Sequence, residues 1–181
     1  MPHRKQQQRA AAIAARAGQG PALGVHLAGR LLASWRFKPG SVIAGFWPLA
    51  GEIDIRPLLL ALAGRGHPIV LPVTPARGKP LSFQRWRPGD VLVRERFGTV
   101  RPTGEPMAPD LLLVPLLAFD GRGRRLGYGG GFYDRTLAGL PGRTAIGCAF
   151  AVQRVDCVAA DVHDIPLQAV ATEHGLMLPK D

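Results

Sequence analysis

Hydrophobic and polar positions at the start of the chain follow the spacing of two helices. Residues 4–17 are rich in alanine, glutamine and arginine, which favour helix, and Gly18 is placed to end that helix. Over residues 23–35, leucines and a tryptophan recur at intervals of four, the spacing of one buried helical face. Pro39 and Gly40 then break the pattern, so a new element is expected after them.

The next part of the chain reads as a strand, a helix and a second strand. Apolar runs at residues 41–47 and 68–73 have the length of buried strands. Between them, Asp54 is a candidate N-cap and Pro57 suits the first turn of a helix that ends near residues 64–66. Two strands joined by a helix pair in parallel, which predicts a parallel sheet.

The middle of the chain combines an irregular segment with the most apolar run. Residues 74–109 are rich in proline, glycine and arginine, and short alternating stretches at 81–86 and 91–95 predict an irregular excursion with a small hairpin. Residues 111–119 are apolar throughout, as in a central strand covered on both faces, and Pro115 marks a bulge or a break there.

The remainder alternates between loop, helix and strand. A glycine-rich loop at residues 120–131 precedes a predicted helix at 132–140, and strands are predicted at 144–151 and 170–172. We find no repeat and no low-complexity linker. The chain is therefore expected to form one compact α/β domain over residues 1–181.

Composition supports a globular protein. Hydrophobic residues make up 46% of the chain and charged residues 20%, which is typical of globular domains. No apolar run reaches the roughly 18 residues of a spanning helix, and no apolar segment follows the basic N-terminus as in a secretory signal. We therefore expect a cytoplasmic protein without a membrane partner. Cys148 and Cys157 are too few for a disulfide framework and lack zinc-ligand spacing.

The formal net charge of +10 favours a polyanionic partner. Nucleic acid, a nucleoside triphosphate and a polyglutamylated cofactor all meet this requirement, and composition does not choose among them. Arg85, Trp86 and Arg87 combine basic and stacking side chains, which favours a nucleic-acid-binding module. Against that alternative, basic residues are scattered along the chain and match no known nucleic-acid motif.

Residues 120–135 carry the candidate chemistry. They follow the most apolar strand and open a helix, and ligands of open α/β sheets bind at the carboxyl ends of strands. Repeated glycines would let the backbone approach a phosphate, and a helix N-terminus supplies free N–H groups. Four arginines lie in the same segment, and Asp134 falls in the first helical turn, where a carboxylate could also hold Mg²⁺. Neither G-x-x-x-x-G-K-[ST] nor G-x-G-x-x-G is present, and the alternative is a flexible turn.

Residues 125–135, R-L-G-Y-G-G-G-F-Y-D-R, closely resemble the signature of the 5-formyltetrahydrofolate cyclo-ligase (5,10-methenyltetrahydrofolate synthetase) family. Further similar segments occur in the family's order: Lys5 with Arg9, residues 47–54, 66–72, 83–90 and 162–167, and Thr172 with Glu173. The resemblance implies a Rossmann-like three-layer α/β sandwich with a mostly parallel central sheet and a small irregular excursion. It also implies an ATP- and Mg²⁺-dependent ligase that converts 5-formyltetrahydrofolate to 5,10-methenyltetrahydrofolate and releases ADP and phosphate.

The resemblance places ATP along the glycine-rich loop and the first helix. The implied ATP-binding residues are Lys5, Arg9, Arg125, Leu126, Gly127, Tyr128, Gly129, Gly130, Gly131, Phe132 and Tyr133. Lys5 and Arg9 stand four positions apart on one helical face, which suits a polyphosphate; without the resemblance, a solvated face would be the favoured explanation. Some family members carry lysine at the position of Gly130, and Arg124 or Arg125 would supply that charge here.

The same resemblance places folate and metal beside ATP. The implied substrate-binding residues are Glu52, Trp47, Tyr128, Gly129, Gly130, Gly131 and Phe132. Glu52 would contact the pterin ring, because a carboxylate can accept two hydrogen bonds from an amino-pyrimidine edge, and Trp47 and Tyr128 are candidate apolar walls. Asp134 and Asp164 are the implied Mg²⁺ ligands. The alternatives are a surface acid for Glu52, a core residue for Trp47 and a turn residue for Asp164.

The implied chemistry needs positioning and charge stabilisation and no protein nucleophile. Arg125, Tyr128 and Lys5 would supply these effects, and no residue is assigned as a certain catalytic group. The histidines at positions 3, 26, 67, 163 and 174 show no ligand spacing, and His163 is the candidate nearest to the implied site. We expect a monomer that binds ATP and 5-formyltetrahydrofolate, with or without a polyglutamate tail, and no nucleic acid. The alternative within the family is a protein that binds these ligands but has lost the activity.

Overall fold

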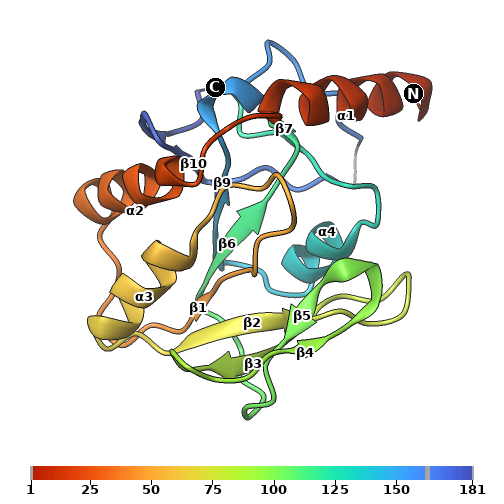
Figure 1. The fold of residues 1–181 in the computed structure, drawn as a ribbon. Helices are drawn as coiled ribbons and strands as arrows, with labels where there is room; N and C mark the ends of the chain where they lie inside the picture. Colours follow the sequence, from red (N-terminus) through yellow and green to blue (C-terminus); the bar gives the residue numbers. More distant parts are fainter. Residues whose placement is uncertain (1, 162–163, 181) are drawn as a thin grey trace.

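The computed structural model describes residues 2–161 and 164–180. Within these residues, seven strands form one sheet in the order β11-β10-β9-β6-β1-β2-β3 (Figure 1). Their bounds are β1 Ile43–Ala44, β2 Ile69–Val73, β3 Ser82–Trp86, β6 Leu111–Pro115, β9 Thr144–Cys148, β10 Ala169–Thr172 and β11 Gly175–Met177. The five strands from β10 to β2 are parallel, and β3 and β11 add antiparallel edges. The predicted mostly parallel α/β sheet is confirmed.

Strand β6 lies at the centre of the sheet because both of its faces are apolar. Leu111 and Leu113 pack into the core on one face, whereas Leu112 and Val114 pack into the core on the other. Pro115 is the last residue of the strand, where the predicted break occurs. A strand of this kind requires cover on both sides.

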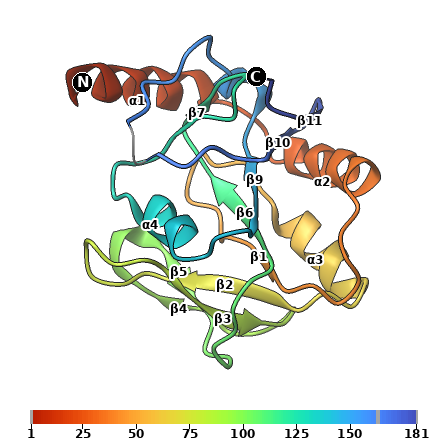
Figure 2. The same ribbon diagram turned by 180° about the vertical axis from the view of Figure 1, so that it is seen from behind.

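Helices provide that cover and form the outer two layers (Figures 1 and 2). Helices α2 (Ala22–Ser34) and α3 (Arg56–Gly64) pack on the face of Leu111, and α4 (Phe132–Ala138) packs on the opposite face. The predicted three-layer sandwich is therefore confirmed. In the residues described, no helix has the length and apolar character needed to cross a membrane.

Helix α1 (Pro2–Arg16) lies outside these layers, at the end toward which β6 points (Figure 1). It rests on the small antiparallel hairpin of β7 (Ala118–Phe119) and β8 (Arg125–Leu126). Ala12 is its buried apolar residue, and it packs in a small cluster with Leu126 and the start of the hairpin. The helix is thus placed over the carboxyl ends of the parallel strands, where polar side chains determine its contacts.

The irregular excursion differs in part from its prediction. The stretch at residues 81–86 pairs antiparallel with β2 and forms the edge of the main sheet. The separate hairpin consists of β4 (Val93–Arg94) and β5 (Val100–Arg101). Phe83 and Trp86 bury on opposite faces of the sheet, so β3 has the apolar surface that an edge strand needs.

Three local expectations were wrong in detail. The strand predicted at residues 41–47 is regular only at β1, because the chain leaves the ladder ahead of Pro48, which has no N–H to donate. The glycine-rich loop includes strand β8, which sequence periodicity did not indicate, and β11 was not predicted. Ile55 occupies the N-cap of α3, while the Asp54 carboxylate accepts a hydrogen bond from Arg56 N at 2.9 Å.

Two glycines of α2 allow a matched test of its packing. A Cβ at Gly24 would lie 2.0 Å from the backbone oxygen of Asp54, whereas a Cβ at Gly29 meets nothing within 4 Å. Gly24→Ala is expected to reduce the free energy of unfolding by about 2 kcal/mol or more, despite the better helix propensity of alanine. Gly29→Ala should stabilise by up to about 1 kcal/mol. Urea unfolding of both variants checks this, and equal effects would contradict the close approach of α2 to the loop before α3.

Candidate active site

The carboxyl ends of the parallel strands meet beneath α1, and the predicted site residues gather there (Figure 1). The loop after β1, the glycine-rich loop after β8 and the segment after β9 end at this edge. Helix α1 contributes Lys5, Arg9 and Arg16, all of which contact these loops. This is the edge at which open α/β sheets bind ligands.

The glycine-rich loop joins β8 to α4 and is held by Arg9. Gly129 has φ +97° and Gly131 has φ +65°, a region that favours glycine. Arg9 Nε donates to the carbonyl oxygen of Gly127 at 2.9 Å, and a Cβ at Gly129 would lie 3.3 Å from the Arg9 guanidinium. Arg9 thus lies against the loop at Gly127 and Gly129, with its charge beside backbone that has no Cβ at these two positions.

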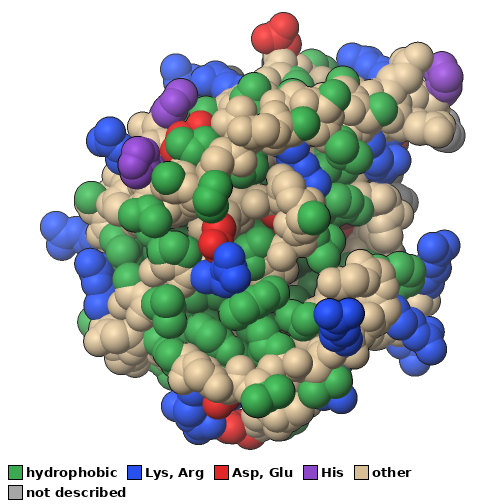
Figure 3. All heavy atoms as spheres, viewed as in Figure 1, with side chains coloured by type: hydrophobic (Ala, Val, Ile, Leu, Met, Phe, Trp, Pro, Cys, Tyr) green, Lys and Arg blue, Asp and Glu red, His purple; other side chains and the backbone are tan. Residues whose placement is uncertain are grey.

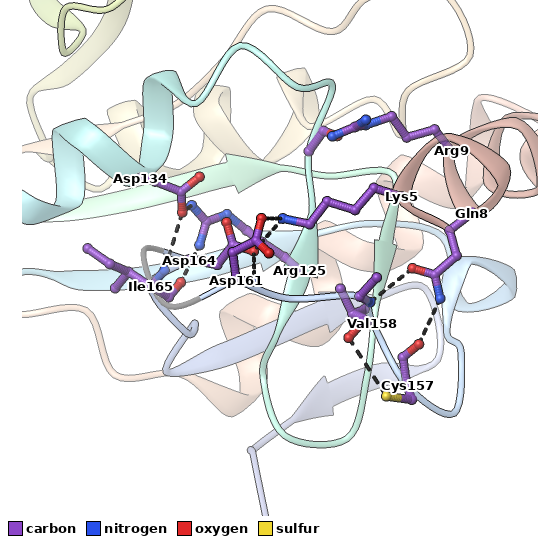
Figure 4. Close-up of polar contacts among 12 residues, drawn as sticks. Lys5, Gln8, Arg9, Arg125, Asp134, Cys157, Val158, Asp161, Asp164 and Ile165 are labelled. Carbon is purple, nitrogen blue, oxygen red and sulfur yellow. Dashed lines mark hydrogen bonds and ion pairs between the residues drawn. The ribbon is translucent and has the colours of Figure 1, made fainter. Parts of the chain in front are cut away.

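Lys5 joins α1 to an acidic pair (Figure 4). Its Nζ donates to Asp161 Oδ2 at 2.6 Å and to Asp164 Oδ2 at 2.9 Å. Burial alone would lower the pKa of Lys5, but hydrogen bonds to both carboxylates outweigh it and raise that pKa. Burial opposes ionisation of Asp164, yet the backbone of Asp161 and the Lys5 ammonium bring its pKa below the usual range. Lys5 thus neutralises a carboxylate that was predicted to bind metal.

A second ion pair joins a predicted phosphate ligand to a predicted metal ligand (Figure 4). Arg125 Nη2 donates to Asp134 Oδ1 at 2.5 Å, and its Nη1 donates to the carbonyl oxygen of Ile165. Ile165 N donates to the same Asp134 oxygen at 3.3 Å. Because Arg125 is 6% exposed, its contacts are with protein, and it connects β8, α4 and the segment that carries Asp164.

Glu52 is held by a tyrosine and a buried arginine. Tyr128 Oη donates to Glu52 Oε1 at 2.5 Å, and Leu49 N donates to Oε2 at 2.8 Å. Arg16 Nη1 in turn donates to Tyr128 Oη at 2.9 Å. Burial raises the pKa of Glu52, and these hydrogen bonds and the Arg16 charge offset that effect only in part. Burial and the Glu52 charge also raise the pKa of Tyr128, so its hydroxyl remains a donor.

The remaining predicted residues line or support the loop. Trp47 is partly buried and packs edge-on against Trp86, with ring centroids 5.9 Å apart, so it is both a core neighbour and a partly exposed wall. Leu126 is 2% exposed and packs in the core, which leaves its backbone as the part nearest the loop. Phe132 opens α4 with a half-buried ring. Tyr133 packs against the core, and burial raises the pKa of its hydroxyl.

Three residues of the site were missed from the sequence. Arg16 stands seven positions after Arg9 on the same helical face, a spacing that could have indicated it. Asp161 contacts Lys5, and no local pattern distinguishes it. Asp120 is 1% exposed and accepts hydrogen bonds from the backbone of its own turn and of residue 158, so it fixes the start of the loop. His163 lies outside the described residues.

The acidic residues fit Mg²⁺ by their donor chemistry. Asp134 and Asp164 offer carboxylate oxygens, and Asp161 adds a third such group nearby. In the described residues, no three or more His, Cys, Asp or Glu side chains form a complete metal-binding group. Mg²⁺ commonly takes one or two carboxylates and completes its shell with phosphate oxygens and water. The arrangement suits an ion that arrives with a polyphosphate.

Basic side chains are spread over the molecule. Figure 3 shows Lys and Arg at separate places around one face, with hydrophobic side chains gathered at its lower left, where α3 and β2 lie. Arg85 and Arg87, the candidate nucleic-acid contacts, both pair with Glu105. This face does not present the continuous basic stripe that is typical of nucleic-acid binding.

The mostly parallel sheet defines a Rossmann-like α/β protein, and the glycine-rich loop with its ion pairs forms a candidate ligand site at the carboxyl edge. Residues 5–173 match the 5-formyltetrahydrofolate cyclo-ligase family. The 5-formyltetrahydrofolate cyclo-ligase of Escherichia coli is 37% identical over 139 residues, which cover 72% of this chain and 76% of that protein. The enzyme of the same name from Mycolicibacterium smegmatis is 34% identical, over 92% of this chain and 88% of that protein.

Solved structures agree with this match. The NMR structure of Aquifex aeolicus 5,10-methenyltetrahydrofolate synthetase is similar with a TM-score of 0.81 and 28% identity, over 98% of this chain and 93% of that chain. The Mycoplasma pneumoniae synthetase has the same fold, with a TM-score of 0.75 at 22% identity over 93% of this chain and 98% of that chain. The chain belongs to the 5-formyltetrahydrofolate cyclo-ligase family and is an enzyme of that family.

Proposed function

We propose that this enzyme uses ATP and Mg²⁺ to convert 5-formyltetrahydrofolate to 5,10-methenyltetrahydrofolate, with release of ADP and phosphate. The observation that carries the proposal is the convergence of α1, the glycine-rich loop and Glu52 at one edge of the sheet. Arg9 contacts Gly127, and Tyr128 of the same loop contacts Glu52. A nucleotide on the loop and a folate on Glu52 would therefore be neighbours.

The reaction balances with these two substrates alone. The formyl oxygen on N5 attacks the γ-phosphorus of ATP, and the bond to the β-phosphate oxygen breaks to release ADP. N10 then attacks the activated formyl carbon, and the carbon–oxygen bond breaks to release phosphate. The N10 proton passes to phosphate or solvent. The protein is required to align the reactants and to stabilise charge on the transferred group.

In this proposal, cations of the site bind the phosphates and carboxylates bind the metal. Lys5 and Arg9 would contact the phosphates from α1, while residues 127–133 would lie along the nucleotide. Asp134 and Asp164 would hold Mg²⁺, which supplies neutralisation of the developing phosphate charge when bound. Since Lys5 already contacts Asp164, nucleotide and metal binding are linked at one place.

The folate would lie on the Glu52 side of the loop. The two oxygens of Glu52, each with one protein donor, retain lone pairs for an amino-pyrimidine edge. Trp47 and Tyr128 would flank the ring system, beside Gly129 to Phe132. The net charge of +10 suits a polyglutamate tail. We further propose that the enzyme is a cytoplasmic, single-domain monomer, which light scattering of the purified protein tests.

A Glu52→Gln variant separates folate binding from stability. The pKa of Glu52 is raised above its ordinary value of 4.5, chiefly by burial, and Tyr128, Tyr133 and Arg16 face it. A carboxyl whose pKa is higher in the folded than in the unfolded protein lowers the free energy of unfolding when it ionises. This loss develops as pH rises from the pKa of the unfolded state to that of the folded state. The variant should therefore be more stable relative to the wild type at neutral pH than in acid, where both side chains are uncharged. Its amide nitrogen faces one of the two donors, Tyr128 Oη or Leu49 N, at every pH. Its kcat/KM for the folate should fall by about 10- to 100-fold, because a charged acceptor is gone.

Thermal unfolding across pH and steady-state kinetics check the two halves of this prediction. Parallel stability curves for the two proteins would contradict the buried, penalised carboxylate. Unchanged kinetics would remove Glu52 from the folate site.

Absorbance tests the proposed function directly. Purified protein is mixed with 5-formyltetrahydrofolate and Mg-ATP, and the near-ultraviolet band of the methenyl product is followed. Growth of the band that requires ATP and is abolished by chelation of Mg²⁺ would support the proposal. A flat trace from folded protein that still binds ATP would contradict it and favour a family member that has lost the activity.

A further inference from the structure

Arg16, the last residue of α1, is a buried cation beside the candidate folate site. Its side chain is 6% exposed, and arginine is seldom buried unless its charge has a partner. Its side-chain hydrogen bond among the described residues goes to a neutral group, the Tyr128 hydroxyl, at 2.9 Å. The Tyr128 hydroxyl in turn donates a hydrogen bond to Glu52 Oε1.

Arg16 and Glu52 together set the direction of the hydrogen bonds, because the guanidinium can only donate and the carboxylate can only accept. A guanidinium donates and cannot accept, so the oxygen of Tyr128 must act as the acceptor toward Arg16. The single hydroxyl proton of Tyr128 is then available to Glu52 Oε1, at 2.5 Å. Without Arg16, the phenol oxygen would lose the donor that holds it in place, and the ring could move away from Glu52. The donor to Glu52 is therefore fixed by a residue that does not itself touch Glu52 through a hydrogen bond.

Packing restricts the same three groups. The Arg16 guanidinium carbon lies 5.6 Å from the centre of the Tyr128 ring. A Cβ at Gly51 would lie 3.6 Å from Arg16 Nε, and Gly51 immediately precedes Glu52. Tyr128 itself is 46% exposed, so little else holds its ring. Arg16 thus connects the glycine-rich loop to the loop after β1.

We propose that Arg16 is a positioning residue for the folate, acting through Tyr128 to orient the Glu52 carboxylate. This inference rests on the proposed function, since it takes Glu52 as the pterin contact. Leu49 N holds the second oxygen of Glu52 at 2.8 Å, so both oxygens are oriented only when Tyr128 donates. The ATP side of the loop is held separately by Arg9, through Gly127.

Kinetics of Arg16 variants test the proposal. Arg16→Ala should raise KM for 5-formyltetrahydrofolate by about 10-fold or more and change KM for ATP by less than about threefold. Arg16→Lys should recover part of the loss, because an ammonium can donate to the Tyr128 hydroxyl but cannot stack on its ring. Tyr128→Phe added to Arg16→Ala should cost little more, since the two residues act in series. Arg4→Ala, an exposed arginine on the same helix, is the matched control and should behave as wild type.

A spectroscopic measurement gives a result that does not depend on turnover. The chain has two tyrosines, Tyr128 and Tyr133. In protein labelled with ¹³C at the tyrosine Cζ, Tyr128→Phe identifies the Tyr128 signal. Arg16→Ala should shift that signal and leave the Tyr133 signal in place, whereas Arg4→Ala should shift neither.

The outcomes separate this inference from the proposed function. A wild-type enzyme that makes no product refutes the proposed function, while the Tyr128 signal still decides whether Arg16 fixes the tyrosine. An active wild type with an unchanged folate KM in Arg16→Ala overturns the inference alone. Equal losses for folate and ATP, together with a lower melting temperature, would overturn it as well, because they indicate a role in holding α1.

Discussion

Asp134→Asn is expected to reduce kcat/KM by at least about 100-fold while the protein stays folded. The substitution removes the negative charge that would hold Mg²⁺ but keeps an oxygen that can accept from Arg125 and from Ile165 N, as Asp134 Oδ1 does at 2.5 and 3.3 Å. Alanine is the poorer choice, because it would leave the nearly buried Arg125 guanidinium without its partner, at a cost of up to about 3 kcal/mol. Loss of activity in an alanine variant would thus confuse metal binding with stability.

Asp110→Asn provides a matched control for this experiment. Asp110 also joins an arginine, Arg143 at 2.7 Å, and a backbone N–H, that of Val42 at 2.9 Å, but it precedes β6 and lies away from the site. Arg143 and Val42 N bond to different oxygens of Asp110, so asparagine keeps only one of these bonds. Asp110→Asn should therefore be no more stable than Asp134→Asn and yet keep full activity. Full activity in Asp134→Asn with saturating Mg²⁺ would remove Asp134 from the metal site.

Lys5→Met is expected to reduce kcat/KM for ATP by about 100-fold and, at the same time, to strengthen binding of Mg²⁺ alone. The first effect follows from the loss of a charged hydrogen-bond donor to phosphate. The second follows because Asp161 and Asp164 both bond to the Lys5 ammonium, at 2.6 and 2.9 Å, and would lose their neutralising partner. Two adjacent carboxylates without a cation attract a divalent ion.

Calorimetry with MgCl₂, or electron paramagnetic resonance with Mn²⁺ as the probe, measures the metal affinity without nucleotide. Arg4→Met is the control, since Arg4 is exposed on the same helix. Weaker or unchanged metal binding in Lys5→Met would show that Lys5 and the ion do not compete for the same carboxylates. In that case the link between nucleotide and metal binding would need another cause.

The sequence predicts the parallel sheet well because burial patterns are local. The apolar run that contains Leu112 specifies a strand covered on both sides, and the spacing of Leu27 and Leu31 specifies a helical face. The partner of a strand is not local information. Residues 81–86 alternate as an edge strand does, yet nothing in them indicates that they join β2 rather than a hairpin of their own. Strand β8 was missed because it is two residues long within a glycine-rich loop.

For the site as well, the sequence indicates the candidate residues but not the contacts that they make. The glycine-rich segment and its resemblance to a family indicate Lys5, Glu52 and the two aspartates as candidates, and the structure brings all of them to one edge. The exact contacts span long separations: 156 positions between Lys5 and Asp161, and 112 between Arg16 and Tyr128. Asp161 therefore became visible as a member of the site only in three dimensions, because no local pattern links it to Lys5. The spacing of Arg16 from Arg9 indicates a shared helical face but not the contact of Arg16 with Tyr128.

Helix α1 depends on segments that are synthesised much later than the helix itself. Gln8 donates to the carbonyl oxygen of Cys157 at 2.8 Å and accepts from Ala159 N at 3.0 Å, and Lys5 pairs with Asp161 and Asp164 (Figure 4). During synthesis, the first helix emerges from the ribosome long before these partners. Until then, charged, amide and alanine side chains make up most of its surface, and Ile13 is its one large apolar side chain.

A helix with few large apolar residues exposes little hydrophobic surface that could aggregate or bind chaperones while the sheet forms. The order of synthesis then makes ligand binding a late event. A nascent chain that ends before residue 157 would contain the glycine-rich loop and Glu52 but could not position Lys5. If Lys5 binds phosphate as proposed, that contact would form only after Asp164 has been synthesised.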